Sequence, residues 1–243
     1  MNAHDLPPRA ADLLERIRSR APRVHCLMNT VVQKFVADGL SALGARPSMT
    51  SSPEEIRSFV RKAEALTVNL GTLDAQRRVA IDLALGAAAE EGKPWALDPA
   101  HCDYSPPRAA LAQELLSRGL AVLRANAAEC ALLAPPPEVA TVRSGETDLI
   151  LRAGSGFAVE NGHPLTAKVT GTGCLSGALI AAFCAVEPDP LTAAASATLA
   201  LGAAAEIAAE GARGPGSFEP ALLDALHALT PSDLLRLARI RDA

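Results

Sequence analysis

The segment from Lys168 to Val186, with the sequence KVTGTGCLSGALIAAFCAV, constrains the fold of this chain more than any other. Its second half, residues 175–186, is apolar at nearly every position and contains no helix breaker other than Gly177. The pattern predicts a helix that is apolar on nearly every face, and such a helix is buried in a folded protein. We therefore expect a rigid, buried helix here.

Two glycines precede the predicted helix. Gly171 and Gly173 flank Thr172, and Cys174 follows in the first turn. A Gly-x-Gly turn that leads into a helix leaves several backbone N–H groups unpaired, and the helix dipole adds about half a positive charge at the same point. This arrangement predicts a phosphate-binding site. We expect a lowered pKa for the Cys174 thiol at a helix start, although glycines also serve simple turns and free cysteines are often inert core residues.

Short apolar stretches alternate with helical patterns along the whole chain. The alternation predicts an α/β fold with a mostly parallel sheet covered by helices on both faces, and the length suits one domain over residues 1–243. Two sequences, Ser52-Pro53-Glu54-Glu55 and Thr230-Pro231-Ser232-Asp233, have the pattern of a capping box at a helix start. The predicted strands are 24–27, 65–70, 95–97, 121–124, 139–142, 149–151 and 157–160, and the predicted helices are 10–20, 31–43, 54–64, 74–91, 108–117, 127–133, 174–186, 191–210, 218–229 and one from 231.

Polar and glycine residues gather where the predicted strands end. In a parallel sheet, ligands bind at the carboxyl ends of the strands. We therefore expect a ligand site at this edge. The residues at the strand ends are Asn29, Asn69 to Thr72, Asp98 with Pro99, Arg124 to Asn126, and Gly171 to Gly173.

The composition indicates which binding partners to expect and in which cellular compartment the protein works. The formal net charge of -4 gives no reason to expect nucleic acid or an anionic membrane as a partner. Five cysteines without a C-x-x-C pair argue against a disulfide framework and a zinc site, and they fit a reducing cytoplasm. The N-terminus lacks the apolar core of a signal peptide, and the apolar runs 175–186 and 191–205 are shorter than the ~20 residues of a membrane helix. We expect a soluble cytoplasmic protein.

The sequence VTGTGC followed by a small, apolar helix resembles the signature of the 4-methyl-5-(2-hydroxyethyl)thiazole kinases. These thiamine-salvage enzymes belong to the ribokinase-like superfamily, in which the motif usually ends in aspartate instead of cysteine. The resemblance implies a three-layer α/β/α fold and phosphorylation of the primary hydroxyl of hydroxyethylthiazole with ATP and Mg²⁺. It also implies that Cys174 is the catalytic residue and that the protein is a homotrimer with substrate sites between subunits.

Two further segments match the family's substrate-binding elements. HCLMNTV, which contains Asn29, is similar to the family's H-C-x-T-N-x-V, and Pro47-Ser48-Met49 resembles its P-x-M segment. By this resemblance, Asn29, Met49 and Gly171 bind the thiazole. A helix cap at Asn29 and core packing at Met49 are the structural alternatives.

Nucleotide and metal roles follow from three more segments. RANAAE (124–129) resembles the family's R-G-N-x-x-E element, and Ser144 takes the place of the first hydroxyl residue of its T-G-E-x-D stretch. The resemblance implies that ATP is bound by Arg124, Asn126, Ser144, Thr172 and Gly173. It also implies that Glu129 and Asp98, the latter in a Leu-Asp-Pro match, hold the water shell of Mg²⁺. A capping box at Asn126 and Glu129 and a plain turn at Ser144 are the structural alternatives.

The chain departs from the family pattern in three places. Ala125 replaces a glycine, the loop 100–105 replaces a glycine-rich V-G-V-G-A-T stretch, and Pro135–Pro137 shortens a connection that normally contains a helix. His101 in the altered loop is either a ligand or proton carrier or a solvent-exposed loop residue. These departures leave two alternatives open: a kinase for another small alcohol, and a non-catalytic member that binds nucleotide or thiazole.

Overall fold

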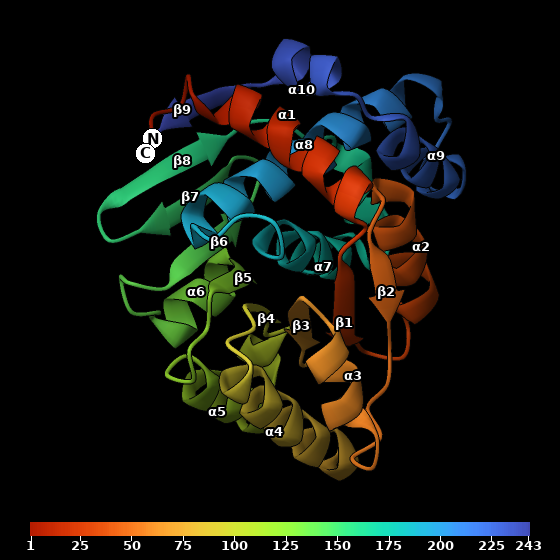
Figure 1. Cartoon of the computed structure of the whole chain (residues 1–243). Coiled ribbons are helices and arrows are strands. Elements are labelled where there is room, and N and C mark those ends of the chain that lie inside the picture. The colour runs from red at the N-terminus through yellow and green to blue at the C-terminus, as the bar shows by residue number, and fades with distance from the viewer.

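In the computed structural model, which describes all 243 residues, nine strands form one sheet in the order β2-β1-β3-β4-β5-β6-β7-β8-β9 (Figure 1). The strands from β2 to β6 pair in parallel, whereas β7, β8 and β9 are added antiparallel to one another and to β6. The prediction of a mostly parallel sheet is confirmed. The strands are β1 Arg23–Leu27, β2 Arg46–Ser48, β3 Ala65–Asn69, β4 Trp95–Asp98, β5 Val122–Asn126, β6 Ala140–Ser144, β7 Asp148–Arg152, β8 Ser155–Val159 and β9 Ile240–Asp242.

Helices cover both faces of the sheet, so the fold has the three predicted layers. In Figure 1, α3 to α6 lie on one face, and α1, α2 and α7 to α10 lie on the other. The helices are α1 Leu6–Arg20, α2 Gln33–Leu43, α3 Ile56–Lys62, α4 Ala75–Glu90, α5 Pro106–Leu115, α6 Ala127–Leu133, α7 Thr172–Cys184, α8 Pro190–Gly211, α9 Pro215–Ala228 and α10 Pro231–Leu237. Two short 3₁₀ helices, η1 Cys102–Tyr104 and η2 Pro164–Lys168, lie in the loops.

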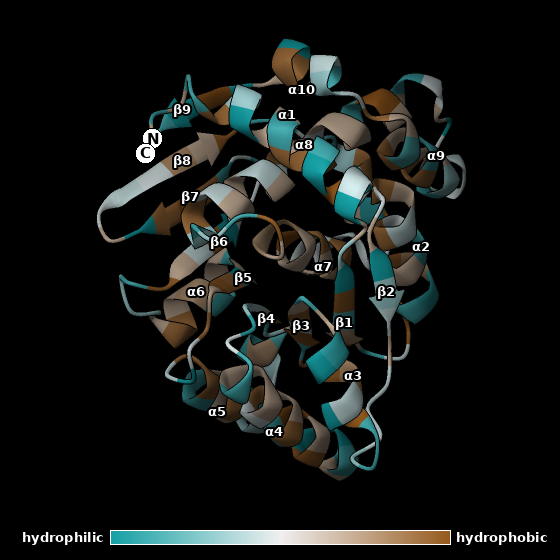
Figure 2. Cartoon of the chain, viewed as in Figure 1, coloured by the Kyte–Doolittle hydropathy of each residue, from teal (hydrophilic) through white to brown (hydrophobic).

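The sheet separates two apolar cores, one under each layer of helices. The larger core is built around α7, whose Leu175, Ile180 and Phe183 are completely buried, as its uniformly apolar sequence predicts. In Figure 2, β3 and β7 are brown, whereas the outer helix α1 mixes brown and teal. The burial of α7 fixes its N-terminus against the carboxyl ends of β1, β3, β4 and β5.

All the predicted helices and strands are present, but several predicted helix starts are wrong. α1 begins at Leu6 instead of residue 10, and α9 begins at Pro215 instead of residue 218. Ser52 does not cap α3, which begins at Ile56 without a side-chain cap, and the Glu55 carboxylate accepts from the Thr50 hydroxyl at 2.5 Å instead of returning to Ser52. Asn29 does not cap α2, which begins at Gln33 without a side-chain cap. The capping box at Thr230 and Asp233 is confirmed. The edge strands β2 and β9 were not predicted, because segments of three residues carry too little periodicity.

The helix α8 is longer than the apolar run 191–205 that the sequence suggested was too short to cross a membrane. It has 22 residues and is long and apolar enough to cross a membrane, although the apolar run looked shorter. However, 78% of its apolar window is buried inside the protein. Its composition is therefore explained by its place in the core, where it packs against α7, α9 and the strands β6 to β8.

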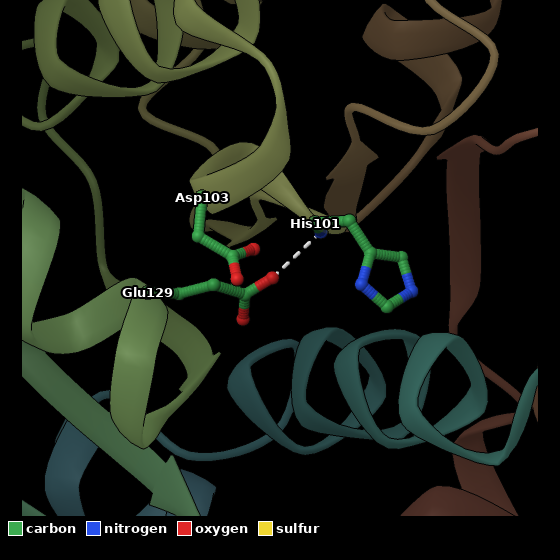
Figure 3. A group of neighbouring side chains, drawn as sticks. All are labelled: His101, Asp103 and Glu129. Carbon is green, nitrogen blue, oxygen red and sulfur yellow. Dashed lines mark hydrogen bonds between the residues drawn. The ribbon is translucent and has the colours of Figure 1, made fainter.

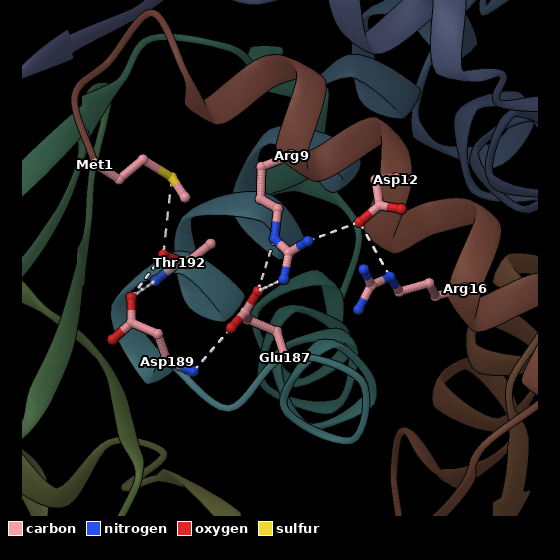
Figure 4. A network of polar contacts seen from close by, with 7 residues as sticks. All are labelled: Met1, Arg9, Asp12, Arg16, Glu187, Asp189 and Thr192. Atoms are coloured by element: carbon pink, nitrogen blue, oxygen red, sulfur yellow. Dashed lines mark hydrogen bonds and ion pairs between the residues drawn. The ribbon is translucent and has the colours of Figure 1, made fainter.

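A buried ion pair connects α1 to the loop that joins α7 and α8. Figure 4 shows Glu187 between Arg9 of α1 and the start of α8. The Arg9 guanidinium donates to Glu187 Oε2 through Nε at 2.8 Å and Nη2 at 2.5 Å, and Glu187 Oε1 accepts from the backbone N–H of Asp189 at 2.9 Å. The Glu187 side chain is 6% exposed and that of Arg9 28%. The pair therefore holds α1 on the central helices.

We expect Glu187→Ala to lower the free energy of unfolding by about 2 kcal/mol, because it removes the buried acceptor of Arg9 Nε and Nη2 and leaves the guanidinium only its more exposed contact with Asp12. Chemical denaturation measures this change. Arg16→Ala is the matched control, since Arg16 pairs with Asp12 where both side chains are 45% exposed. Such an exposed pair contributes less than about 1 kcal/mol. Equal losses in both variants would contradict the assigned role of Glu187.

Candidate functional site

The N-terminus of α7 faces the carboxyl ends of the parallel strands, where the sequence predicted a ligand site. The backbone N–H groups of Gly173 and Cys174 have no acceptor in the preceding turn, and the first backbone bond of the helix runs from Leu175 to the carbonyl of Gly171 at 2.7 Å. These free donors point out of the helix start together with its dipole. The geometry is that of an anion cradle.

Two glycines shape this cradle. Gly171 has φ +100°, a left-handed conformation that glycine adopts without strain, and a Cβ there would lie 2.8 Å from Val32 Cγ1. A Cβ on Gly173 would lie 2.7 Å from Nη1 of Arg124. The guanidinium of Arg124 therefore lies directly against the backbone of the helix start, where only a glycine leaves it room.

Arg124 and Ser144 come together from neighbouring parallel strands. The Arg124 Nη2 donates to Ser144 Oγ at 3.1 Å, while the buried Arg124 Nε has no partner. Two of the predicted ATP-binding residues thus lie together beside the α7 cradle. A guanidinium next to free backbone amides is suited to phosphate oxygens, which accept several hydrogen bonds at once.

Cys174 lies among polar side chains from the ends of β1, β3 and β4. Its Sγ accepts from Asn29 Nδ2 at 3.5 Å and from Asn69 Nδ2 at 3.3 Å. The prediction of a lowered pKa is wrong. Burial, followed by the nearby Asp98 carboxylate, raises the pKa of the Cys174 thiol to about 12, and Arg124 opposes this only in part. At neutral pH the group is therefore a thiol.

The predicted metal residues, Asp98 and Glu129, are both buried carboxylates. Asp98 accepts from Asn69 Nδ2 at 2.7 Å and from the backbone N–H of Ala100 at 3.0 Å. Glu129 accepts from the backbone N–H of His101 at 2.6 Å, as Figure 3 shows, and from that of Asn126 at 2.8 Å. Neither carboxylate has an ion pair, so both fit the oxygen-ligand chemistry of Mg²⁺ and its water shell.

Three predicted site residues have structural roles. The side chain of Asn126 caps α6 and forms a capping box with Glu129, the alternative that the sequence left open. The Thr172 hydroxyl donates to the carbonyls of Thr166 at 2.7 Å and Val169 at 3.2 Å. Met49 is half-buried against the larger core, on the loop that follows β2. Because the side chains of Asn126 and Thr172 already make these hydrogen bonds, only the backbone groups of the two residues remain free to bind a ligand.

Sequence reasoning gave no role to three positioning residues. Asn69, which was predicted only to lie at the ligand edge, links Asp98 to Cys174. Arg77, which is 4% exposed, donates to backbone carbonyls at the ends of β1 and β3, those of Leu27 at 3.4 Å and Asn69 at 2.8 Å. His25 is completely buried and bonds Ser48 Oγ at 2.9 Å and the Thr50 carbonyl at 3.2 Å, on either side of Met49. His25 belongs to the HCLMNTV segment, but its partners Ser48 and Thr50 are distant in the sequence, so its buried position was not predicted. No local pattern marks Arg77.

We expect His25 to make the protein less stable in acid. Burial lowers the pKa of His25 from 6.5 to about 4, although the Thr50 carbonyl and Glu55 oppose the shift. The unfolded chain therefore binds this proton first. The stabilisation that comes from burying neutral His25 is fully present above pH 6.5. As the pH falls from 6.5 to 4, the free energy of unfolding drops by about 3 kcal/mol. Denaturation at several pH values measures this loss. The loss should be smaller by that amount in His25→Asn, and an unchanged pH dependence would contradict the prediction.

Comparison with known proteins identifies the family. The model of the "Hydroxyethylthiazole kinase family" matches residues 14–136 and 132–232. A "Probable hydroxyethylthiazole kinase" of Agrobacterium fabrum is 56% identical over 232 residues, which cover 96% of this chain and 94% of the relative. The chain belongs to the hydroxyethylthiazole kinase family. It is therefore a phosphotransferase of the ribokinase-like class, with ATP as the co-substrate expected of a kinase.

More distant members agree with this assignment. The "Hydroxyethylthiazole kinase" of Clavibacter sepedonicus is 40% identical over 259 residues, covering 96% of this chain and 94% of the relative. The solved hydroxyethylthiazole kinase protein of Pyrococcus horikoshii OT3 superposes with a TM-score of 0.93 at 36% identity, covering 97% of this chain and 99% of that one. A pyridoxal kinase from Staphylococcus aureus, at 13% identity and a TM-score of 0.60, shares the ribokinase-like fold alone.

The kinase has no helix between α6 and β6, where Pro135–Pro137 were expected to shorten the connection. A cavity of about 610 Å³ lies beside this connection, lined by the proline run, by Cys130 and by Leu151. The altered loop 100–105 folds into the short helix η1. Side chains of this loop therefore stand beside Glu129, where the family's glycines would leave only backbone.

Proposed function

We propose that this kinase transfers the γ-phosphoryl group of ATP to the primary hydroxyl of 4-methyl-5-(2-hydroxyethyl)thiazole. The observation that carries the proposal is the Arg124 guanidinium, packed against Gly173 beside the free amides of Gly173 and Cys174. These donors suit a phosphoryl group in transfer, whose loose transition state depends mainly on positioning and on charge stabilisation. The names of the relatives supply the substrate.

The proposed roles of the remaining residues follow from their contacts. Arg124 and Ser144 hold the phosphates of ATP, together with the amides of Thr172 and Gly173. When bound, Mg²⁺ neutralises phosphate charge, and Asp98 and Glu129 would hold its water shell. Cys174, kept as a thiol, orients the substrate hydroxyl toward the γ-phosphorus. A thiol is sufficient, because the alcohol needs little activation before the bond to the leaving ADP has loosened.

The substrate side of the proposal rests on Asn29, Met49 and Gly171. Asn29 contacts Cys174, and Met49 is held by the bonds of His25 to Ser48 and Thr50. We further propose that residues 1–243 act as one kinase domain, which a single sheet running from β2 to β9 supports. We also propose a homotrimer, testable by light scattering, and a cytoplasmic location, which five free cysteines support.

A direct assay tests the proposed function. Purified protein with ATP, Mg²⁺ and the thiazole alcohol should form the thiazole phosphate, detected by ³¹P NMR and mass spectrometry. ADP release with a panel of other small alcohols tests the second candidate, which the altered loop 100–105 favours. If calorimetry detects ATP or thiazole binding but no alcohol is phosphorylated, the protein is a binding member of the family and the proposal is wrong.

A further inference from the structure

The segment that leads into the first turn of α7 belongs neither to the sheet nor to an α-helix. It comprises residues 160–171, between the end of β8 and the start of α7, and its only regular element is the short helix η2. Burial fixes the body of α7, but residues 171–174 are only half-buried. The position of this first turn, which carries the free amides, therefore depends also on what holds the segment 160–171.

Hydrogen bonds tie the first turn of α7 to this segment. The Thr172 hydroxyl donates to the carbonyls of Thr166 at 2.7 Å and Val169 at 3.2 Å. Thr166 in turn donates to the His163 carbonyl through its hydroxyl at 2.7 Å and its backbone N–H at 3.0 Å. A displacement of residues 161–163 would therefore move the hydrogen-bond partners of Thr172.

The beginning of the segment is held by Glu206 of α8, whose side chain is 17% exposed. Glu206 Oε1 accepts from the backbone N–H of Gly162 at 2.8 Å and from Asn161 Nδ2 at 3.1 Å. Arg239, between α10 and β9, donates to Oε1 through Nη2 at 2.6 Å and to Oε2 through Nη1 at 3.1 Å. Burial would raise the pKa of Glu206, but the hydrogen bonds from Arg239, Gly162 and Asn161 lower it below its usual value. The group is therefore a carboxylate at neutral pH.

Asn161 joins the same cluster to the C-terminal part of the chain. It is 4% exposed, its Nδ2 also donates to the Leu237 carbonyl at 2.8 Å, and its Oδ1 accepts from the backbone N–H of Arg239 at 2.8 Å. A Cβ on Gly202 of α8 would lie 2.7 Å from the Asn161 carbonyl oxygen, so the segment lies directly against α8. Residues 237–239, which lead from α10 into β9 beside β8 in Figure 1, therefore hold Asn161 in place.

We propose that Glu206, Asn161 and Arg239 are positioning residues that hold the first turn of α7 in the geometry required for phosphoryl transfer. Their hydrogen bonds do not reach the free amides, so they act through the segment 160–171. Such a role affects the rate because a misplacement of about 1 Å in a catalytic site costs about a hundredfold. The inference deepens the proposed function and rests on it for the reaction whose rate is measured.

Kinetics and hydrogen exchange on the full chain test this role. Arg239→Ala should lower kcat by about tenfold and change the KM for ATP by less than about twofold, since it disturbs the transition-state geometry more than ATP binding. The amides of residues 162–174 should exchange faster in this variant without any ligand, as measured by mass spectrometry. Arg239→Lys should restore part of kcat, because lysine keeps the charge but not the paired donors. Glu206→Gln should resemble Arg239→Ala, because a neutral amide loses the charge-assisted bonds.

Arg241→Ala is the matched control. Arg241 of β9 pairs with Glu160 at 3.0 Å, where the two side chains are 62% and 44% exposed, and it does not contact Glu206. This variant removes the same charge from the same part of the chain, and it should leave both kcat and the exchange of residues 162–174 unchanged. Circular dichroism and denaturation verify that every variant is folded at the assay temperature, and Arg239→Lys and Glu206→Gln carry the test if Arg239→Ala does not fold.

The outcomes separate this role from a stabilising one and from the proposed function. If Arg239→Ala and Glu206→Gln are less stable but keep the wild-type kcat and exchange, the three residues only stabilise the fold and the inference is wrong. Normal thiazole phosphorylation in both variants removes the positioning role alone. If the wild type does not phosphorylate the thiazole, the proposed function fails. Faster exchange of residues 162–174 in Arg239→Ala would then still support the positioning role, and kcat is compared on the alcohol that the protein does phosphorylate.

Discussion

Replacing Cys174 by alanine should lower kcat about a hundredfold while changing the KM for ATP little. The thiol lies at the start of α7 and accepts hydrogen bonds from the side-chain N–H groups of Asn29 and Asn69. In the proposed function, the substrate hydroxyl binds beside it. Loss of the group that orients the reacting hydroxyl costs about two orders of magnitude in rate. Steady-state kinetics with the thiazole alcohol measures this effect.

Cys174→Asp should keep or raise the rate. An aspartate is the residue that usually ends this motif in the superfamily, and its carboxylate would receive the same donors from Asn29 and Asn69. Cys130→Ala is the matched control, because Cys130 is another partly buried thiol with a raised pKa, on α6 away from Cys174. Unchanged kcat in Cys174→Ala would remove the thiol from the mechanism.

The raised pKa of Cys174 adds a chemical test. With a pKa of about 12, roughly one thiol in ten thousand is ionised at pH 8. Alkylation by iodoacetamide should therefore be much slower than that of a free thiol, and the rate of phosphorylation should show no step from this thiol between pH 6 and 9. Rapid alkylation at neutral pH would show that the helix dipole outweighs burial and lowers the pKa of Cys174, which would contradict this prediction.

The second large effect is expected at Arg124. Arg124→Ala should lower kcat/KM for ATP by about two to three orders of magnitude, because it removes the only guanidinium packed against the helix start. Arg124→Lys should recover part of the loss, since lysine restores the charge but not the paired donors of the planar guanidinium. Initial rates at varied ATP concentration, together with calorimetric titration of ATP, measure the change.

Arg143→Ala provides the control for charge. Arg143 lies on the neighbouring strand β6, beside Ala125 in the register, but its side chain is exposed and makes no hydrogen bond within the chain. Removing it lowers the net positive charge of the region by the same amount without opening the cradle. If Arg143→Ala and Arg124→Ala lose ATP affinity equally, the contact of Arg124 with Gly173 is not what binds the phosphates.

The sequence by itself determined the framework of this protein. The uniformly apolar run after Cys174 predicts a buried helix, and α7 is that helix. The alternation of strands and helices predicts the three layers, because each element has to bury its apolar side against another. The clustering of polar residues at strand ends predicts where Asn29, Asn69 and Asp98 meet, because parallel strands bring their carboxyl ends to one edge.

Only the tertiary structure decided the chemistry of individual groups. The start of α7 suggested a reactive thiol at Cys174, but burial next to Asp98 outweighs the helix dipole and raises its pKa. The left-handed turn at His101 and the buried imidazole of His25 are likewise set by partners distant in the chain. Periodicity reports which side of an element is buried, whereas solvation and hydrogen-bond partners depend on neighbours that only the folded chain brings together.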